Sequence, residues 1–136
     1  MIQSISDLNK EKKYDCSGNK KQSQIASASW TPAQLYKDKV AKMQRSMEHL
    51  GVDGIICFKP QNTFFLSGFN PVLYSHPVVV IVPREGDAVL LVHSLRARHS
   101  ADEAAIDDIR LFGMWANQKP IANDAYTAIG IIADDL

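Results

Sequence analysis

The stretch Gly51–Phe69 constrains the fold most, because its hydrophobic pattern changes within a few residues. Gly54–Phe58 is a short apolar run of β-branched and aromatic residues, which is typical of a buried strand. Pro60 ends that strand, since proline has no backbone N–H to donate to a sheet. Beyond it, Phe64–Leu66 fit one turn of helix or a tight loop, and Ser67-Gly68 is a turn signal. The stretch therefore predicts a strand that stops abruptly at a turn.

A helix is predicted immediately before this strand. Thr31 is a good N-cap, Pro32 suits the first helical position, and Gln34 can complete a capping box. Apolar side chains then recur at helical spacing until Gly51 provides the C-terminal stop. The recurring residues are Tyr36, Val40, Met43, Met47 and Leu50. We expect this stripe to be core and to pack against the strand.

Two nearly continuous apolar runs follow. Pro77–Val82 and Ala88–His93 predict strands, and the turn between them contains Gly86, which can adopt positive φ. The two strands should form a hairpin. Because both are apolar almost throughout, the sheet should be covered on both faces.

The last part of the chain mixes further helices and strands. Ser100 and Glu103 form a possible capping signal. Helices are expected over Ser94–Ala105 and near Ala122–Ala128, and strands over Asp108–Phe112 and Ile129–Ile132. Interleaved strands and helices with one hairpin predict a three-layer α/β domain, a mixed β-sheet flanked by helices.

Length and charge limit the organisation and the partners. The 136 residues suffice for one domain with a core, which we place at residues 30–136. Residues 1–29 are polar and lysine-rich and predict a disordered or loosely attached leader; a basic docking arm is the alternative. The net charge of zero gives no reason to expect nucleic acid or a membrane as partner.

No complete catalytic constellation is recognisable, and we predict no catalytic residue and no metal ligand in this chain. The sequence has no Gly-rich phosphate loop and no Gly-x-Ser-x-Gly elbow. His93 and His99, with the acids that follow them, could suggest an independent metalloenzyme, but their spacing favours a solvated surface. Those acids are Asp102, Glu103, Asp107 and Asp108. Cys57 lies in the first predicted strand, where a buried thiol fits a reducing cytoplasm.

Tyr74 and His76 are the candidate binding residues. They lie in a loop next to Pro77, which fixes the entry into a strand, and they combine an aromatic face with a switchable donor. The alternative is structural: His76 caps backbone groups at the strand start, and Tyr74 covers the edge of the core.

From Thr31 to Leu136 the chain resembles the N-terminal domain of creatinase, prolidase and aminopeptidase P. That family has a "G-V-D-A-hydrophobic" strand followed by "P-x-N-I-x-Y-L-T-G-F". The hairpin turn at Gly86-Asp87, the Asp108–Phe112 strand and the segment Ile129-Gly130-Ile131 are similar to later family elements. The matching residues of the motif are Asn62, Phe65, Leu66, Gly68 and Phe69.

The resemblance implies a ribonuclease-H-like topology and a domain without its own chemistry. In the family a C-terminal "pita-bread" domain carries two divalent metals, or a metal-free histidine site in creatinase. The N-terminal domain builds the dimer or tetramer, and its loop can reach into a partner's active site. In creatinase an aromatic residue and an arginine of this loop bind the substrate carboxylate. In this chain Tyr74 and His76 stand at the positions that correspond to these loop residues. Histidine instead of the arginine of creatinase argues against creatine and is more similar to ectoine-hydrolase and Xaa-Pro-peptidase branches.

The chain ends at Leu136, before a metal-ligand segment could begin, and Gly113–Ile129 is short compared with many relatives. We therefore expect the catalytic domain to be absent from this chain, either a cut piece or a truncated gene product. The expected function is a non-catalytic, cytoplasmic N-terminal domain of a creatinase/Xaa-Pro peptidase-type hydrolase, homo-oligomeric and inactive alone, without a cofactor. The alternative is a free-standing binding module for a small ligand or a protein.

Overall fold

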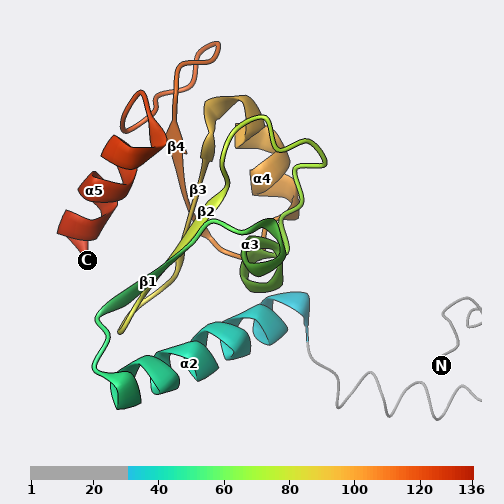
Figure 1. Ribbon diagram of the computed structural model, residues 1–136. Helices are drawn as coiled ribbons and strands as arrows, with labels where there is room; N and C mark the ends of the chain where they lie inside the picture. The colour runs from blue at the N-terminus through green and yellow to red at the C-terminus, as the bar shows by residue number, and fades with distance from the viewer. Residues whose placement is uncertain (1–30) are drawn as a thin grey trace, which may run out of the picture. The chain divides into compact units, whose positions relative to one another are not determined.

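The computed structural model describes residues 31–136, which contain a four-stranded mixed sheet in the order β1-β2-β3-β4 (Figure 1). β1 pairs antiparallel with β2 and β2 with β3, whereas β3 and β4 run parallel. The predicted leader, residues 1–29, lies outside the described residues. The strands are β1 (Gly54–Cys57), β2 (Val79–Pro83), β3 (Val89–His93) and β4 (Asp108–Phe112).

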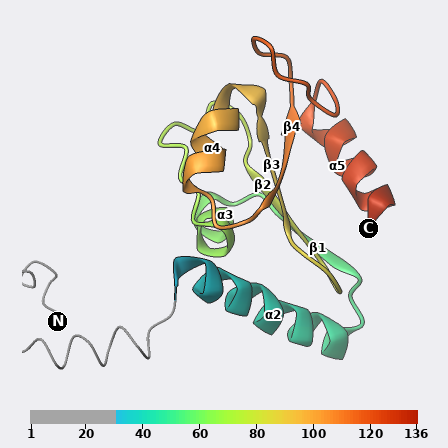
Figure 2. The same cartoon turned by 180° about the vertical axis from the view of Figure 1, so that it is seen from behind.

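Helices cover both faces of this sheet. α5 lies on one side, and α3 and α4 lie on the other, as the two opposite views agree (Figures 1 and 2). This arrangement confirms the three-layer α/β prediction. No helix within residues 31–136 combines the length and the apolarity needed to cross a bilayer. The helices are α2 (Pro32–Leu50), α3 (Pro60–Ser67), η1 (Ser94–Arg96), α4 (Ala97–Glu103) and α5 (Ala125–Asp135).

Alternation along the central strands divides the core into two clusters. Val80 and Leu90 pack with Met47 of α2, whereas Ile81 and Leu91 face Ile132 of α5. Successive strand residues point to opposite faces, so a strand buried on both faces must be apolar throughout. Every residue of β2 is buried, as the hairpin pattern predicted.

Cys57 belongs to the α2-side cluster, which confirms its assignment to the core. Burial raises the pKa of its thiol above the ordinary value, so the reactive thiolate is disfavoured.

The first predicted strand is less buried than its composition suggests. Ile56 and Phe58 are close to half exposed, Gly54 is exposed and Ile55 is half-buried, so the expectation of a buried strand is confirmed only at Cys57. The reason is position: β1 is an edge strand, and α5 packs on β3 and β4. By contrast, the predicted core stripe of α2 is confirmed at Met47, which is buried. Leu50, at the end of the same helix, is exposed.

The predicted fifth strand, Ile129–Ile132, is wrong, because these residues lie within α5. Asp124 caps this helix: its Oδ1 accepts a hydrogen bond from the Thr127 backbone N–H at 2.9 Å. That bond lowers the pKa of Asp124. Ala125, Ala128 and Ile132 then face the sheet at helical spacing. A short apolar run does not distinguish strand from helix, and the capping residue was the missed signal.

The capping signal predicted at Ser100 and Glu103 is also wrong. Ser100 is buried inside α4, where its hydroxyl donates to the Ala97 carbonyl at 3.0 Å. The helical segment instead begins at His93, whose Nδ1 accepts a hydrogen bond from the Leu95 N–H at 3.1 Å. Histidine is an unusual cap, so the sequence pattern did not indicate it.

Candidate functional site

The loop of residues 70–78 joins α3 to β2 and is fastened to the segment that follows β3. The Asn70 N–H donates to Glu103 Oε2 at 3.2 Å, and Arg96 Nη2 donates to the Leu73 carbonyl at 3.3 Å. Pro71, which belongs to the loop, is buried. These contacts hold the loop at the carboxyl end of β3, next to η1 (Figure 1).

His76 is placed by a ring stack on His93, the last residue of β3. The two imidazole centroids lie 3.9 Å apart with an interplanar angle of 20°. Ser75 Oγ lies 3.2 Å from His76 Nδ1. On its other side His93 meets Phe112, the last residue of β4, edge to face at 5.3 Å. His76 therefore rests on a platform built by two parallel strands.

Hydrogen bonding and packing define the state of His93. Because its Nδ1 accepts the Leu95 N–H, the proton of the neutral ring is assigned to Nε2. Burial lowers the pKa of His93, and the charge of His76 lowers it further. Gly113 lies against the ring with φ +76°, and a Cβ at that position would fall 2.3 Å from Nε2. Only glycine leaves room for this imidazole.

Exposed apolar side chains occur on both chain segments that border the stack. Val72, Leu73 and Tyr74 are 76%, 68% and 41% exposed, and Trp115 after β4 is 52% exposed. Val72 also has φ +67°, which is strained for a β-branched residue. A group of exposed apolar residues of this kind is typical of a surface that contacts another molecule. The predicted pair, Tyr74 and His76, lies in this surface, which we call the loop surface: residues 72–76 and 113–115.

The other motif residues have visible structural places. Gly68 ends α3 with φ +72°, and its N–H donates to the Phe64 carbonyl at 2.8 Å. Phe69 is fully buried and meets His99 edge to face at 4.9 Å. Phe65 is exposed, with Lys39 Nζ 4.2 Å above its ring, and Asn62 is exposed on α3. None of these residues lies in the loop surface. The contacts described for them lie in α3 and in the turn that follows it.

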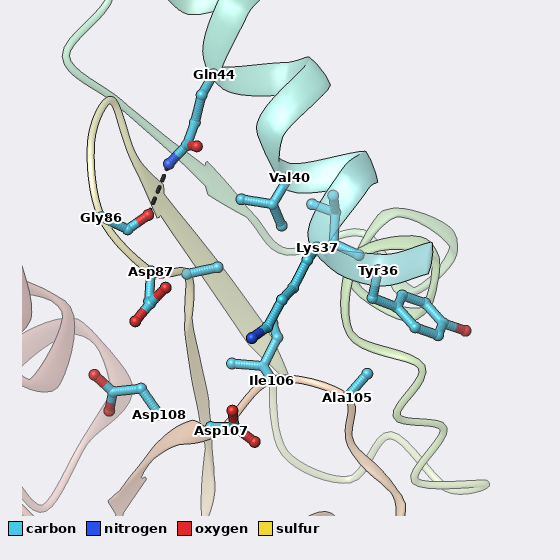
Figure 3. A pocket seen from close by; sticks show the side chains of 12 residues that line it. Tyr36, Lys37, Val40, Gln44, Gly86, Asp87, Ala105, Ile106, Asp107 and Asp108 are labelled. Carbon is cyan, nitrogen blue, oxygen red and sulfur yellow. Dashed lines mark hydrogen bonds between the residues drawn. The ribbon is translucent and has the colours of Figure 1, made fainter. Parts of the chain in front are cut away.

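A pocket of about 390 Å³ lies elsewhere on the domain, between α2, the β2–β3 turn and the connection from α4 to β4 (Figure 3). Gln44 closes one side: its Nε2 donates to the carbonyls of Pro83 and Gly86, both at 2.9 Å. Leu66 and Ile106 are buried and form part of an apolar floor.

Charged groups border this floor. Lys37 reaches into the space bordered by Asp87 and Asp107 (Figure 3). Within residues 31–136, none of these three side chains makes an ion pair with another charged group. Asp108 is already engaged, because Arg110 donates to it from Nε at 2.6 Å and from Nη2 at 3.0 Å. The pocket can hold a small charged molecule, but its lining provides no nucleophile with an adjacent base.

The histidines and acids considered for a metal are separated by the fold. His99 Nε2 contacts Glu103 Oε1 at 2.6 Å, whereas His93 stacks on His76. In the part of the chain that the structure describes, no group of three or more His, Cys, Asp or Glu side chains could hold a metal ion.

No local sequence pattern indicated that His93 and Gly113 contribute to this surface. A usable signal existed: a strand, a helix and a further strand predict a crossover with parallel strands, whose carboxyl ends share one edge of the sheet. His93 and Phe112 are paired there in the observed register.

Comparisons with known proteins agree with this fold. The family model of the Creatinase/Prolidase N-terminal domain matches residues 39–134. No curated protein matches the chain. Among solved structures, the Creatinase/Prolidase N-terminal domain of an X-Pro dipeptidase from Streptococcus pyogenes is 14% identical, with a TM-score of 0.52; the match covers 71% of this chain and 66% of that one.

Longer solved chains match as well. Dipeptidase PepE from Mycobacterium ulcerans is 16% identical, with a TM-score of 0.52, over 65% of this chain and 24% of that chain. Recombinant prolidase from Thermococcus sibiricus is 21% identical, with a TM-score of 0.52, over 74% and 25%. The matched region thus spans about a quarter of these chains. At such identities the structural likeness shows the fold, while the family model covers most of the sequence: this chain belongs to the creatinase/prolidase N-terminal domain family.

Proposed function

We propose that residues 31–136 act as the non-catalytic N-terminal domain of a creatinase/Xaa-Pro peptidase-type hydrolase. In this proposal the domain mediates self-association and presents Tyr74 and His76 to the active site of a partner subunit in the cytoplasm. The observation that carries it is the loop surface, where a half-exposed tyrosine and a histidine are held among exposed apolar residues. No nucleic acid or membrane is required, and the partner is a second copy.

The construction of the loop supports this function. Its backbone is fixed by Glu103 and Arg96, and His76 is oriented by His93, so the His76 side chain is presented with little freedom. Preorganised aromatic and hydrogen-bonding groups lose less conformational entropy when they bind. Tyr74 offers a ring and a hydroxyl, and His76 offers a donor that can carry positive charge, which suits a carboxylate-bearing substrate.

We infer that residues 31–136 hold no catalytic metal. The family's catalytic domain uses two divalent metals, but the residues described here do not supply a ligand group for one. We therefore derive no catalytic step from this domain, and the chain alone is expected not to hydrolyse Xaa-Pro dipeptides.

The pocket favours a second candidate, a free-standing module that binds a small ligand. Its volume of about 390 Å³ and the opposite charges of Lys37 and Asp107 would suit a small zwitterion. It ranks second because Lys37, Asp87 and Asp107 are exposed, and the half-buried Asp108 is already paired with Arg110.

Photo-crosslinking of the full chain tests the first proposal. Because we propose no active site within residues 31–136, this experiment tests the contact between two copies. A benzophenone amino acid at position 74 should give a crosslinked homodimer if the loop surface borders the second copy, and light scattering of the unmodified chain should show a dimer or larger oligomer. Tyr126 on α5 is the matched control, since it is a more exposed tyrosine outside the loop surface. The proposal would be contradicted if light scattering shows a monomer and crosslinking is equal from positions 74 and 126 or absent from both. That result would favour the binding module.

A further inference from the structure

The stack of His76 on His93 joins two titratable groups at van der Waals distance, and its surroundings are unusual. Neither imidazole has a hydrogen bond or ion pair to a carboxylate within residues 31–136. The nearby charged groups are engaged elsewhere: Arg96 with the Leu73 carbonyl, and Glu103 with Asn70 and His99. No counter-charge therefore offsets a proton on both rings.

The contacts of His93 make it the ring that resists a second proton. Its Nδ1 already accepts the Leu95 N–H, so a proton on that nitrogen would remove the bond that starts η1. The ring is also enclosed by Phe112, the last residue of β4, and by Gly113, which follows it. A cationic His76 above a neutral His93 is a favourable arrangement of a cation on an aromatic face, whereas two cationic rings 3.9 Å apart repel.

We propose that His93 is a positioning residue for His76, and that their stack tolerates one proton but not two, so that acidification releases residues 72–76 from the end of β3. This inference rests on the proposed function, because those residues form the surface offered to the partner. It adds a regulatory property: Arg96 and Glu103 fasten the loop backbone to the segment after β3, and the ring stack completes the presenting conformation only while His93 is neutral.

Three substitutions separate the ring stack from the other contacts of His93. His93→Phe retains an aromatic ring but cannot be protonated, and His93→Asn retains a side-chain acceptor for the Leu95 N–H but removes the ring. His76→Gln removes the neighbouring charge from an exposed loop, so this variant should keep the fold of the core. Imidazole resonances of His49 on α2, far along the chain from this site, provide the internal control.

The measurement is an NMR titration of the full chain from about pH 8 to about pH 5, the range in which histidine changes charge. It follows the His93 ring and the amide protection of Val72 and Leu73, whose N–H groups donate to Asn70 Oδ1 and the Pro71 carbonyl. We expect these amides to lose protection several-fold as His93 is protonated. His93→Phe should abolish that pH dependence, and His93→Asn should give low protection at every pH. In His76→Gln the pKa of His93 should rise toward its ordinary value.

Two results would overturn the inference: a His93 titration that His76→Gln does not change, or loss of loop protection at the same pH in His93→Phe and the unmodified chain. Light scattering of the same samples separates this failure from that of the proposed function. An uncoupled histidine pair in a dimer would overturn only the positioning inference. A coupled pair in a monomer would overturn the function and leave the coupling established.

Discussion

The loop surface and the pocket are two parts of one small domain, and they differ in how they are built. The loop surface carries exposed apolar side chains on a backbone fixed by hydrogen bonds, with His76 stacked on His93 and Gly113 against the same ring. The pocket has a volume of about 390 Å³, an apolar floor and charged borders. Gln44 links α2 to the β2–β3 turn there by two hydrogen bonds. The comparison teaches that the region with a cavity is not the region whose side chains are held by more contacts.

The difference has an energetic meaning. At the loop surface the side chains that contact one another come from separate elements, so a substitution there should disturb several contacts at once. At the pocket Lys37, Asp87 and Asp107 are exposed and make no ion pairs with one another, so most substitutions of these residues should be tolerated. Stability measurements on matched pairs of variants can test this contrast.

The largest effect is expected for Gly113→Ala. Gly113 has φ +76°, and an added Cβ would lie 2.3 Å from His93 Nε2. Left-handed strain costs about 1–2 kcal/mol for a residue with a Cβ, and displacement of the ring adds to it, so we expect a loss of about 2–4 kcal/mol in the free energy of unfolding. Urea denaturation monitored by circular dichroism measures it.

Gly86→Ala is the matched control. Gly86 also has positive φ, at +99°, but an added Cβ would meet nothing within 4 Å. Only the strain remains, and we expect a loss of about 1–2 kcal/mol. Equal losses at Gly86 and Gly113 would show that the contact with His93 contributes nothing, and the contrast between the two regions would fail.

An intermediate effect is expected for Gln44→Ala at the pocket. This substitution removes two hydrogen bonds of 2.9 Å to the β2–β3 turn, and it should lower the free energy of unfolding by about 1–2 kcal/mol. Lys37→Met is the comparison variant, because Lys37 lines the same pocket and makes no ion pair with another residue of the range 31–136. It should change stability by less than about 0.5 kcal/mol. A larger loss for Lys37→Met than for Gln44→Ala would indicate an organised charged site.

The smallest effect is a dependence of stability on acidity that originates at the loop surface. Burial, and then the charge of His76, lower the pKa of His93 in the folded protein. The unfolded chain therefore takes up this proton at higher pH, near the ordinary value of about 6.5, and the free energy of unfolding falls as the pH drops through that value. Denaturation at a series of pH values should show this decline, reduced in His76→Gln and unchanged in Lys37→Met. An identical decline in all three proteins would assign it to another group.

Local patterns predicted much of the fold. Pro32 and Gly51 mark the ends of α2, the apolar runs became β2 and β3, and Gly86 has the positive φ of a hairpin turn. The pattern misled at Ile129–Ile132, because a short apolar run fits a strand or a helix equally well, and burial against β3 and β4 decided for a helix. For the candidate site, the loop with Tyr74 and His76 was anticipated, and their role stays a prediction.

The sequence by itself determined where segments begin and end and which of them are apolar, because caps, turns and periodicity depend on neighbours within a few residues. It also carried the family's motif around Gly68. Only the tertiary structure decided that His76 lies on His93 and that Gly113 borders the same ring, since these residues are far apart in the chain and meet through the register of β3 and β4. Contacts between distant residues depend on how strands pair and pack, which no local pattern specifies.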